Sequence, residues 1–209
     1  MKNIIVVFLT VLSLYSCKDN IRTKTISIEK NEPLKSEEEN TLTRSASDTI
    51  DYVNRGLEYA LSTQAILGKN LMQAIEKGGT VEALAFCNEQ AYPLTDSMAV
   101  VHNVRLKRVS DQPRNIENIA NTEELNYIEN YKKSIANQVS PEPLVINSGT
   151  DVKVYYPIVT NAMCLQCHGK ASNIEARTRK KLTILYPKDK ALDYGVNELR
   201  GIWRVTFNN

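Results

Sequence analysis

Two cysteines and a histidine form the pattern in this sequence that most directly indicates chemistry. Cys164, Cys167 and His168 stand in the run Cys-Leu-Gln-Cys-His. Cysteines at this spacing can both bond the vinyl groups of one porphyrin, and the histidine that follows is then held under the iron as an axial ligand. The spacing therefore predicts one haem c, covalently attached through Cys164 and Cys167 and bound to iron by His168.

Two other chemistries also use closely spaced cysteines. A thioredoxin-like redox pair lies at the start of a helix within a βαβ unit, and no such pattern surrounds Cys164. A zinc site needs four ligands, commonly from a second closely spaced pair. The rest of the chain offers only Cys87 and His102 for that purpose. Both alternatives are therefore weaker than haem attachment.

The first 16 residues have the features of an export signal. Lys2 precedes an apolar run that is too short to span a bilayer. The run ends in Leu14-Tyr15-Ser16-Cys17, which resembles the lipobox of bacterial lipoproteins. We therefore expect a lipid on Cys17 to anchor the protein to a membrane of the cell envelope, with the folded domain outside the cytoplasm, in the periplasm. The alternative is cleavage by the ordinary signal peptidase, which would leave Cys17 as a free thiol.

Cys87 is the cysteine that these assignments leave over. It is either a buried structural thiol on the apolar face of a helix or a thiolate ligand on the side of the iron opposite His168. Water or a gas could also occupy that sixth position. The other side chains that compete for it are His102, Met72, Met98 and Met163. Met163 is disfavoured because it adjoins the attachment motif and would have to pass around the porphyrin edge. Spacing alone does not decide among the rest.

Composition and charge limit the classes of function. The chain has 209 residues, 26 Lys and Arg against 24 Asp and Glu, and 42% hydrophobic residues, which is typical of a globular protein. A net charge of +2 gives no reason to expect a nucleic-acid partner. Roughly 150 residues remain once both ends are set aside, enough to bury a core without disulfide bonds.

Hydrophobic periodicity predicts helices first and strands later. Residues 17–47 are polar and charged, and we expect the lipidated cysteine to be followed there by a flexible tether. Three-and-four spacing predicts a helix from an N-cap at Asp48 to Gly78-Gly79 and a second helix from Thr80 to about Pro93. Thr122 is expected to cap a third helix that ends near Asn137.

The second half of the chain changes to period two. A hairpin is expected over 144–156, a short helix over 172–181 and a last strand over 201–207. The fold class is therefore α+β. The expected domains are a lipoprotein signal peptide over 1–16, the lipidated cysteine and tether over 17–47, and a haem-binding domain over 48–209.

Several short runs between residues 48 and 207 match the pattern of a known family. They are Ala85-Phe86-Cys87-Asn88, Arg108-Val109-Ser110 with Arg114-Asn115 and Asn118, Tyr156-Pro157-Ile158, Tyr186-Pro187-Lys188-Asp189-Lys190-Ala191 and Leu199-Arg200-Gly201-Ile202-Trp203. Together with the attachment motif they resemble a bacterial extracytoplasmic haem-binding domain with a PAS-like fold, catalogued as domain of unknown function 3365.

This resemblance implies a PAS-like antiparallel sheet that carries the haem. It also implies that Cys87 lies across the iron from His168. Family members often precede signalling modules and are suspected redox or gas sensors. Arg108 and Arg114 are candidates to bind the haem propionates, because guanidinium pairs well with carboxylate; the alternative for each is a salt bridge or a solvated surface position.

Three functional classes follow from these residues. The leading one is a redox or gas sensor that acts through a redox or signalling partner, with a small gas as a candidate ligand, since no kinase or cyclase sequence follows Phe207. The second is a monohaem electron-transfer cytochrome. An enzyme such as a peroxidase comes last, because no distal histidine motif is present and a bound sixth ligand would block peroxide. We therefore expect no enzymatic activity.

Overall fold

The computed structural model describes residues 36–208, with side chains from Asp48 onward. The expected signal peptide over 1–16, the lipidation site Cys17 and the first part of the expected tether lie outside the described residues. Among the described helices, none combines the length and the apolar character that crossing a bilayer requires.

The first helix, α1 (Ser36–Glu89), begins earlier than predicted. Asp48 lies inside it and is not its N-cap, and residues 36–47 are helical where the composition predicted a tether. A helix extends at little cost once it has nucleated, so a polar stretch can continue a helix that packing stabilises further along the chain.

The expected break at the paired glycines is confirmed. Gly78 and Gly79 have non-helical backbone angles, and Gly79, with φ of 68° and ψ of −162°, lies in a region that is open essentially to glycine alone. Pro93, expected near the end of the second helix, instead lies in the first turn of α2 (Ala91–His102). A proline is tolerated there because the first amides of a helix have no acceptor within it.

Four strands form one antiparallel sheet in the order β1-β4-β3-β2. The predicted hairpin is present as β2 (Leu144–Ser148) and β3 (Asp151–Val159), and the predicted last strand is β4 (Leu199–Asn208). The segment after α2 contains β1 (Arg105–Val109). The α+β class is therefore confirmed.

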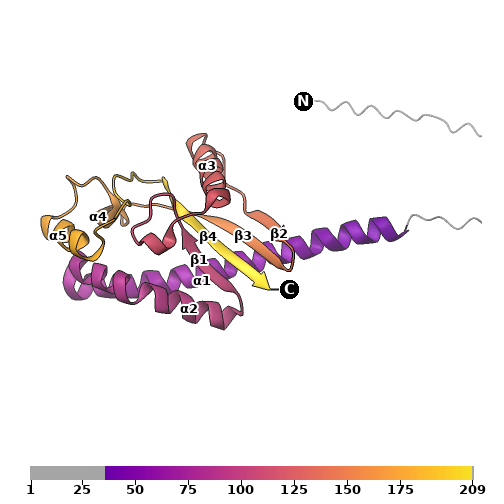
Figure 1. The fold of residues 1–209 in the computed structure, drawn as a ribbon, viewed down its shortest axis with the longest axis horizontal. Coiled ribbons are helices and arrows are strands. Elements are labelled where there is room, and N and C mark those ends of the chain that lie inside the picture. The colour runs from indigo at the N-terminus through magenta and orange to yellow at the C-terminus, as the bar shows by residue number, and fades with distance from the viewer. Residues whose placement is uncertain (1–35, 209) are drawn as a thin grey trace, which may run out of the picture.

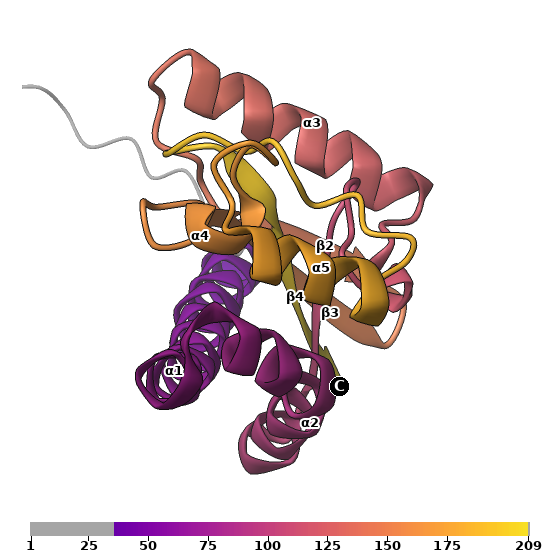
Figure 2. The same cartoon turned by 90° about the vertical axis from the view of Figure 1, so that its left-hand side faces the viewer.

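Helices cover both faces of the sheet. The helices α1 and α2 lie along one face and α3 (Thr122–Ala136) lies on the other (Figure 1). The N-cap of α3 is Asn121, not Thr122, because Asn121 and Glu124 form a reciprocal capping box. The short helices α4 (Leu165–His168) and α5 (Ala176–Leu185) lie at one end of the sheet (Figure 2). A 3-10 helix, η1 (Ile116–Asn118), follows β1.

The core divides between the two faces of the sheet. Tyr156 and Trp203 pack with residues of α1 and α2, whereas Tyr155 packs with Ile128 and Tyr131 of α3. Neighbouring tyrosines on β3 therefore enter opposite layers, as the period of a strand requires. Tyr155, Tyr156 and Trp203 are all buried, so they belong to the core of the domain.

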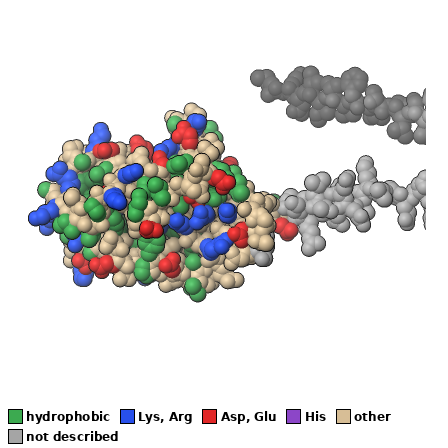
Figure 3. Space-filling model, in the orientation of Figure 1, with side chains coloured by type: hydrophobic (Ala, Val, Ile, Leu, Met, Phe, Trp, Pro, Cys, Tyr) green, Lys and Arg blue, Asp and Glu red, His purple; other side chains and the backbone are tan. Residues whose placement is uncertain are grey.

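The outer surface carries charges of both signs. On the face shown in Figure 3, acidic and basic side chains are interspersed among apolar ones. This distribution accords with the nearly balanced net charge of the chain.

Candidate cofactor-binding site

A cavity of about 520 Å³ lies between α1, the sheet and the attachment motif. Its volume falls within the range of small-molecule and cofactor sites. Gly68, in the middle of α1, lines the cavity, and nothing lies within 4 Å of a Cβ added there. At Gly68 the helix therefore leaves space in the cavity that a side chain would occupy. Apolar side chains form most of the remaining lining, among them Leu61, Leu67, Leu71, Ile75, Phe86 and Trp203.

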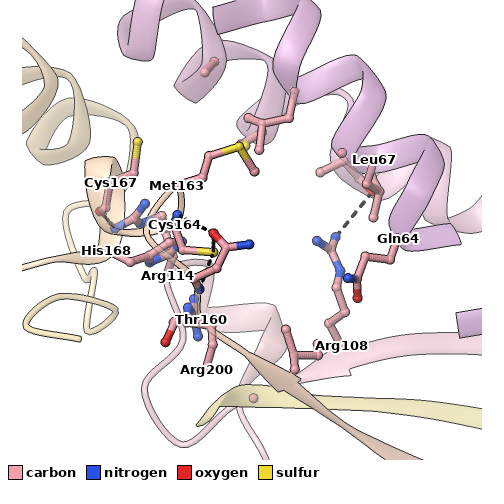
Figure 4. A pocket seen from close by; sticks show the side chains of 18 of the residues that line it. Gln64, Leu67, Arg108, Arg114, Thr160, Met163, Cys164, Cys167, His168 and Arg200 are labelled. Atoms are coloured by element: carbon pink, nitrogen blue, oxygen red, sulfur yellow. Dashed lines mark hydrogen bonds between the residues drawn. The ribbon is translucent and has the colours of Figure 1, made fainter. Parts of the chain in front are cut away.

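The cavity brings together the site residues that were predicted from the sequence. Cys164 and His168 lie on one side of it, and Arg108 lies opposite them beside Gln64 and Leu67 (Figure 4). The lining also includes Cys87, Arg114 and Cys167.

Local hydrogen bonds place the attachment motif directly after β3. The Thr160 hydroxyl donates to the Gly195 carbonyl at 2.7 Å. The Asn161 side-chain oxygen then accepts from the Cys164 amide at 3.2 Å and begins the turn. Gly169 follows helix α4 as its C-cap, and an added Cβ there would lie 2.6 Å from the Leu165 carbonyl oxygen. The close approach at Gly169 therefore requires glycine at the end of the motif.

His168 is held as a neutral imidazole with one ring nitrogen free to bind a metal. Its Nδ1 lies 2.9 Å from the Ala191 carbonyl oxygen. A carbonyl can only accept, so Nδ1 carries the proton and Nε2 keeps its lone pair. Burial lowers the pKa of His168 well below its ordinary value, and the charges of Arg114 and Arg200 lower it further. This is the protonation state that binds iron.

Cys87 lines the cavity next to the buried Leu84. Burial raises the pKa of the Cys87 thiol, and the nearby Cys167 adds to that shift, while Arg108 and Arg114 oppose it. The thiol is therefore neutral unless a cation such as iron stabilises its anion.

The other side chains considered for the sixth position are distributed differently. Met163 lines the cavity, whereas Met98 is buried in the core between the helices and the sheet. Met72 is not among the lining residues. His102 stacks on Tyr59 at 4.1 Å and forms a 2.9 Å hydrogen bond with Ser62, also away from the cavity. Proximity therefore favours Cys87 and Met163 over the others.

The structure assigns different roles to the arginines of the cavity. Arg114 forms a buried ion pair with Asp189, in which Nε lies 3.0 Å from Oδ2. Arg108 has only long contacts, 3.4 Å to the Thr95 hydroxyl and 3.5 Å to the Ala91 carbonyl, and lies over Trp203. The salt-bridge alternative thus describes Arg114, and Arg108 remains available to an anionic ligand.

Arg200 is a third arginine of the lining, and the sequence reasoning did not select it. It donates to the Ser110 hydroxyl at 3.0 Å, but its buried Nε has no hydrogen-bond partner among the described residues. No Asp or Glu is among the described residues that line the cavity. Asp189 forms its ion pair with Arg114. Burial lowers the pKa of Arg200, and the charge of Asp189 partly opposes that shift. Arg108 and Arg200 are thus two buried arginines of the lining for which no ion pair is found among the described residues.

These features fit a haem better than a bare metal ion. Among the described residues, no three His, Cys, Asp or Glu side chains gather in the way that a metal cluster requires. The lining is mainly apolar, a histidine and a cysteine are available as ligands, and two unneutralised guanidinium groups match the two propionates of a haem.

Sequence reasoning missed Arg200 and Asp189 for a common reason. Each lies inside a run that carries the family resemblance, but neither has a spacing to the motif that indicates a contact. The runs were the available signal, and only the folded chain shows that Arg200 lines the cavity and that Asp189 pairs with Arg114 of the lining.

Comparisons with known proteins show the family and the fold of the chain. A family model described as Tll0287-like matches residues 29–208. A solved structure described as the crystal structure of the cyanobacterial heme-protein Tll0287 is similar, with a TM-score of 0.54 and 19% sequence identity over 74% of this chain and 95% of that one. At this identity the likeness shows the fold, which confirms the PAS-like α+β architecture. No curated protein matches the chain.

Proposed function

Because the chain belongs to the Tll0287-like family, we propose that it is an extracytoplasmic haem c protein that senses redox state or a small gas through changes at the iron. The observation that carries this proposal is that Cys87 and His168, from different elements, line one cavity with the two cysteines of the attachment motif. The role is one of binding and signalling, without enzymatic activity.

The residues of the cavity have distinct roles in holding the haem. Cys164 and Cys167 would form the thioether bonds, and His168 would present Nε2 because its Nδ1 is held by the Ala191 carbonyl. Arg108 and Arg200 would pair with the propionates. When bound, the haem supplies an iron that changes oxidation state and can exchange its sixth ligand.

Cys87 is the element that can change position between two states. A thiolate favours ferric iron, so the balance between a bound and a released Cys87 depends on the oxidation state. Burial of Cys87 favours the neutral thiol over the free thiolate. Reduction by an electron-donating partner would therefore favour release of Cys87, which would take up one proton as it leaves the iron. The sixth position would then be open to a gas, which couples redox state to ligand binding.

The proposal also covers where the protein is anchored and which kind of partner receives its signal. A lipid on Cys17 would hold the domain at a membrane of the cell envelope, on the periplasmic side, where haem c is attached. A redox or signalling protein partner would receive the change at Cys87.

Absorption spectra of the purified holo-protein test this function. Wild type and Cys87→Ala are compared oxidised and reduced, with carbon monoxide added to each reduced sample. Met163→Ala is the matched control, because it removes the other sulfur considered for the sixth position that lines the cavity.

Sensing predicts that Cys87→Ala changes the ferric spectrum, that Met163→Ala does not, and that reduced wild type binds carbon monoxide. A reduced wild type that stays six-coordinate and closed to carbon monoxide, with a spectrum unaffected by Cys87→Ala, would instead make the protein an electron-transfer cytochrome.

A further inference from the structure

Arg114 and Asp189 form an ion pair in the interior beside the attachment motif. Their side chains are 9% and 8% exposed. Removing two charges from water is costly, and the mutual attraction compensates only when further hydrogen bonds satisfy both groups. A pair this deeply buried therefore needs additional partners in the surrounding backbone.

Those partners belong to the motif and to the loop that faces it. Arg114 Nη2 donates to the Cys167 carbonyl at 2.5 Å and to the Ala191 carbonyl at 3.1 Å. Asp189 accepts from the Ala191 amide at 2.8 Å through Oδ1. The ion pair therefore ties the backbone of the motif to the loop over 189–191.

One carbonyl in this network has two donors. The Ala191 oxygen accepts from Arg114 Nη2 and also from His168 Nδ1, at 2.9 Å. The hydrogen-bond partner of an iron-binding histidine sets the orientation of its ring and its strength as a ligand. Here that partner is itself in contact with a guanidinium cation.

We propose that the Arg114–Asp189 pair is a positioning device for His168 that also limits its strength as an iron ligand. The inference rests on the proposed function, in which His168 binds haem iron. Arg114 draws electron density from the Ala191 oxygen, which becomes a weaker acceptor and leaves the proton firmly on Nδ1. His168 is then a weaker electron donor, and the ferrous state is favoured relative to a site without Arg114.

Two measurements on the holo-protein test this role. The first is the midpoint potential. The second is the iron–histidine stretching frequency of the reduced haem, recorded in a Cys87→Ala background that leaves His168 as the axial protein ligand. Loss of Arg114 in Arg114→Gln should lower the potential and raise the frequency, because the freed carbonyl accepts more strongly from Nδ1. Arg114→Lys keeps the charge without the forked geometry and should give an intermediate frequency.

Arg204→Gln is the matched control. Arg204 also forms an ion pair with a buried carboxylate, 2.7 Å from Glu124 Oε1, but it makes no contact with the motif. This variant should unfold at lower urea concentration while its potential and stretching frequency stay at the wild-type values.

Different outcomes would overturn the role of Arg114 and the proposed haem-binding function. A lower potential with an unchanged stretching frequency in Arg114→Gln would mean that the arginine acts only as a distant charge and would overturn the inference. If Arg114→Gln does not fold, a wild-type frequency in Arg114→Lys does the same. A wild-type protein that carries no haem would overturn the proposed function itself.

Discussion

Gly56 marks a close approach of α1 to the sheet, so Gly56→Ala should destabilise the protein even though alanine favours a helix. A Cβ at this position would lie 2.5 Å from the Tyr156 hydroxyl oxygen and 3.3 Å from the nearest ring carbons. Tyr156 is 3% exposed, and its hydroxyl donates to the Val53 carbonyl at 2.6 Å. The ring therefore has no free space into which it can move.

The expected magnitude combines three effects. Alanine gains about 1 kcal/mol over glycine in a helix. Displacing Tyr156 loses a hydrogen bond, about 1 kcal/mol, and overpacks the core at a cost of about 1 to 3 kcal/mol. The free energy of unfolding should thus fall by about 1 to 3 kcal/mol in Gly56→Ala. Tyr156→Phe alone should lose about 1 kcal/mol.

The double variant isolates the contact. Without the hydroxyl, the new methyl group meets only ring carbons, so Gly56→Ala should be nearly neutral in the Tyr156→Phe background. The two changes should therefore be non-additive by about 2 kcal/mol, well above the roughly 0.5 kcal/mol scatter of independent sites.

Urea unfolding of the four proteins, followed by circular dichroism, measures this coupling. Tyr131→Phe is the control, because its hydroxyl donates to the Tyr155 carbonyl at 3.0 Å on the opposite face of the sheet, and its effect should add to that of Gly56→Ala. Additive effects of Gly56→Ala and Tyr156→Phe, or a stabilised Gly56→Ala, would refute the packing of α1 against Tyr156.

Two further predictions concern pH and the cofactor. Burial raises the pKa of Tyr131 to about 12 from an ordinary value of 10.0, so its contribution to stability is complete below pH 10 and is lost as the pH rises toward 12. In urea unfolding over that range, the free energy of unfolding should therefore fall less for Tyr131→Phe than for wild type. An equal fall in the two proteins would contradict the raised pKa of Tyr131. If Arg108 binds a propionate, Arg108→Gln should raise the dissociation constant for haem about tenfold in a Cys164→Ala, Cys167→Ala background, whereas the exposed Arg177→Gln should leave it unchanged in the same haem titration.

Local patterns predicted the fold well where a single physical requirement dominates. The hairpin followed from period two and from the turn residues between β2 and β3, and the break at Gly78 and Gly79 followed from the backbone freedom of glycine. Pro93 shows the limit, because a proline ends one helix or opens the next according to where the first turn falls. That position depends on how the chain packs after Glu89, which no local pattern contains.

The same distinction explains the candidate site. Cys164, Cys167 and His168 could be found because their chemistry depends on spacing along the chain. Arg114 could not be assigned, since an arginine suits a propionate and an aspartate equally well, and its partner Asp189 lies 75 residues away. The pairing matters because it decides the charge of the cavity: with Arg114 neutralised, Arg108 and Arg200 remain, and their two charges are what a dianionic cofactor requires.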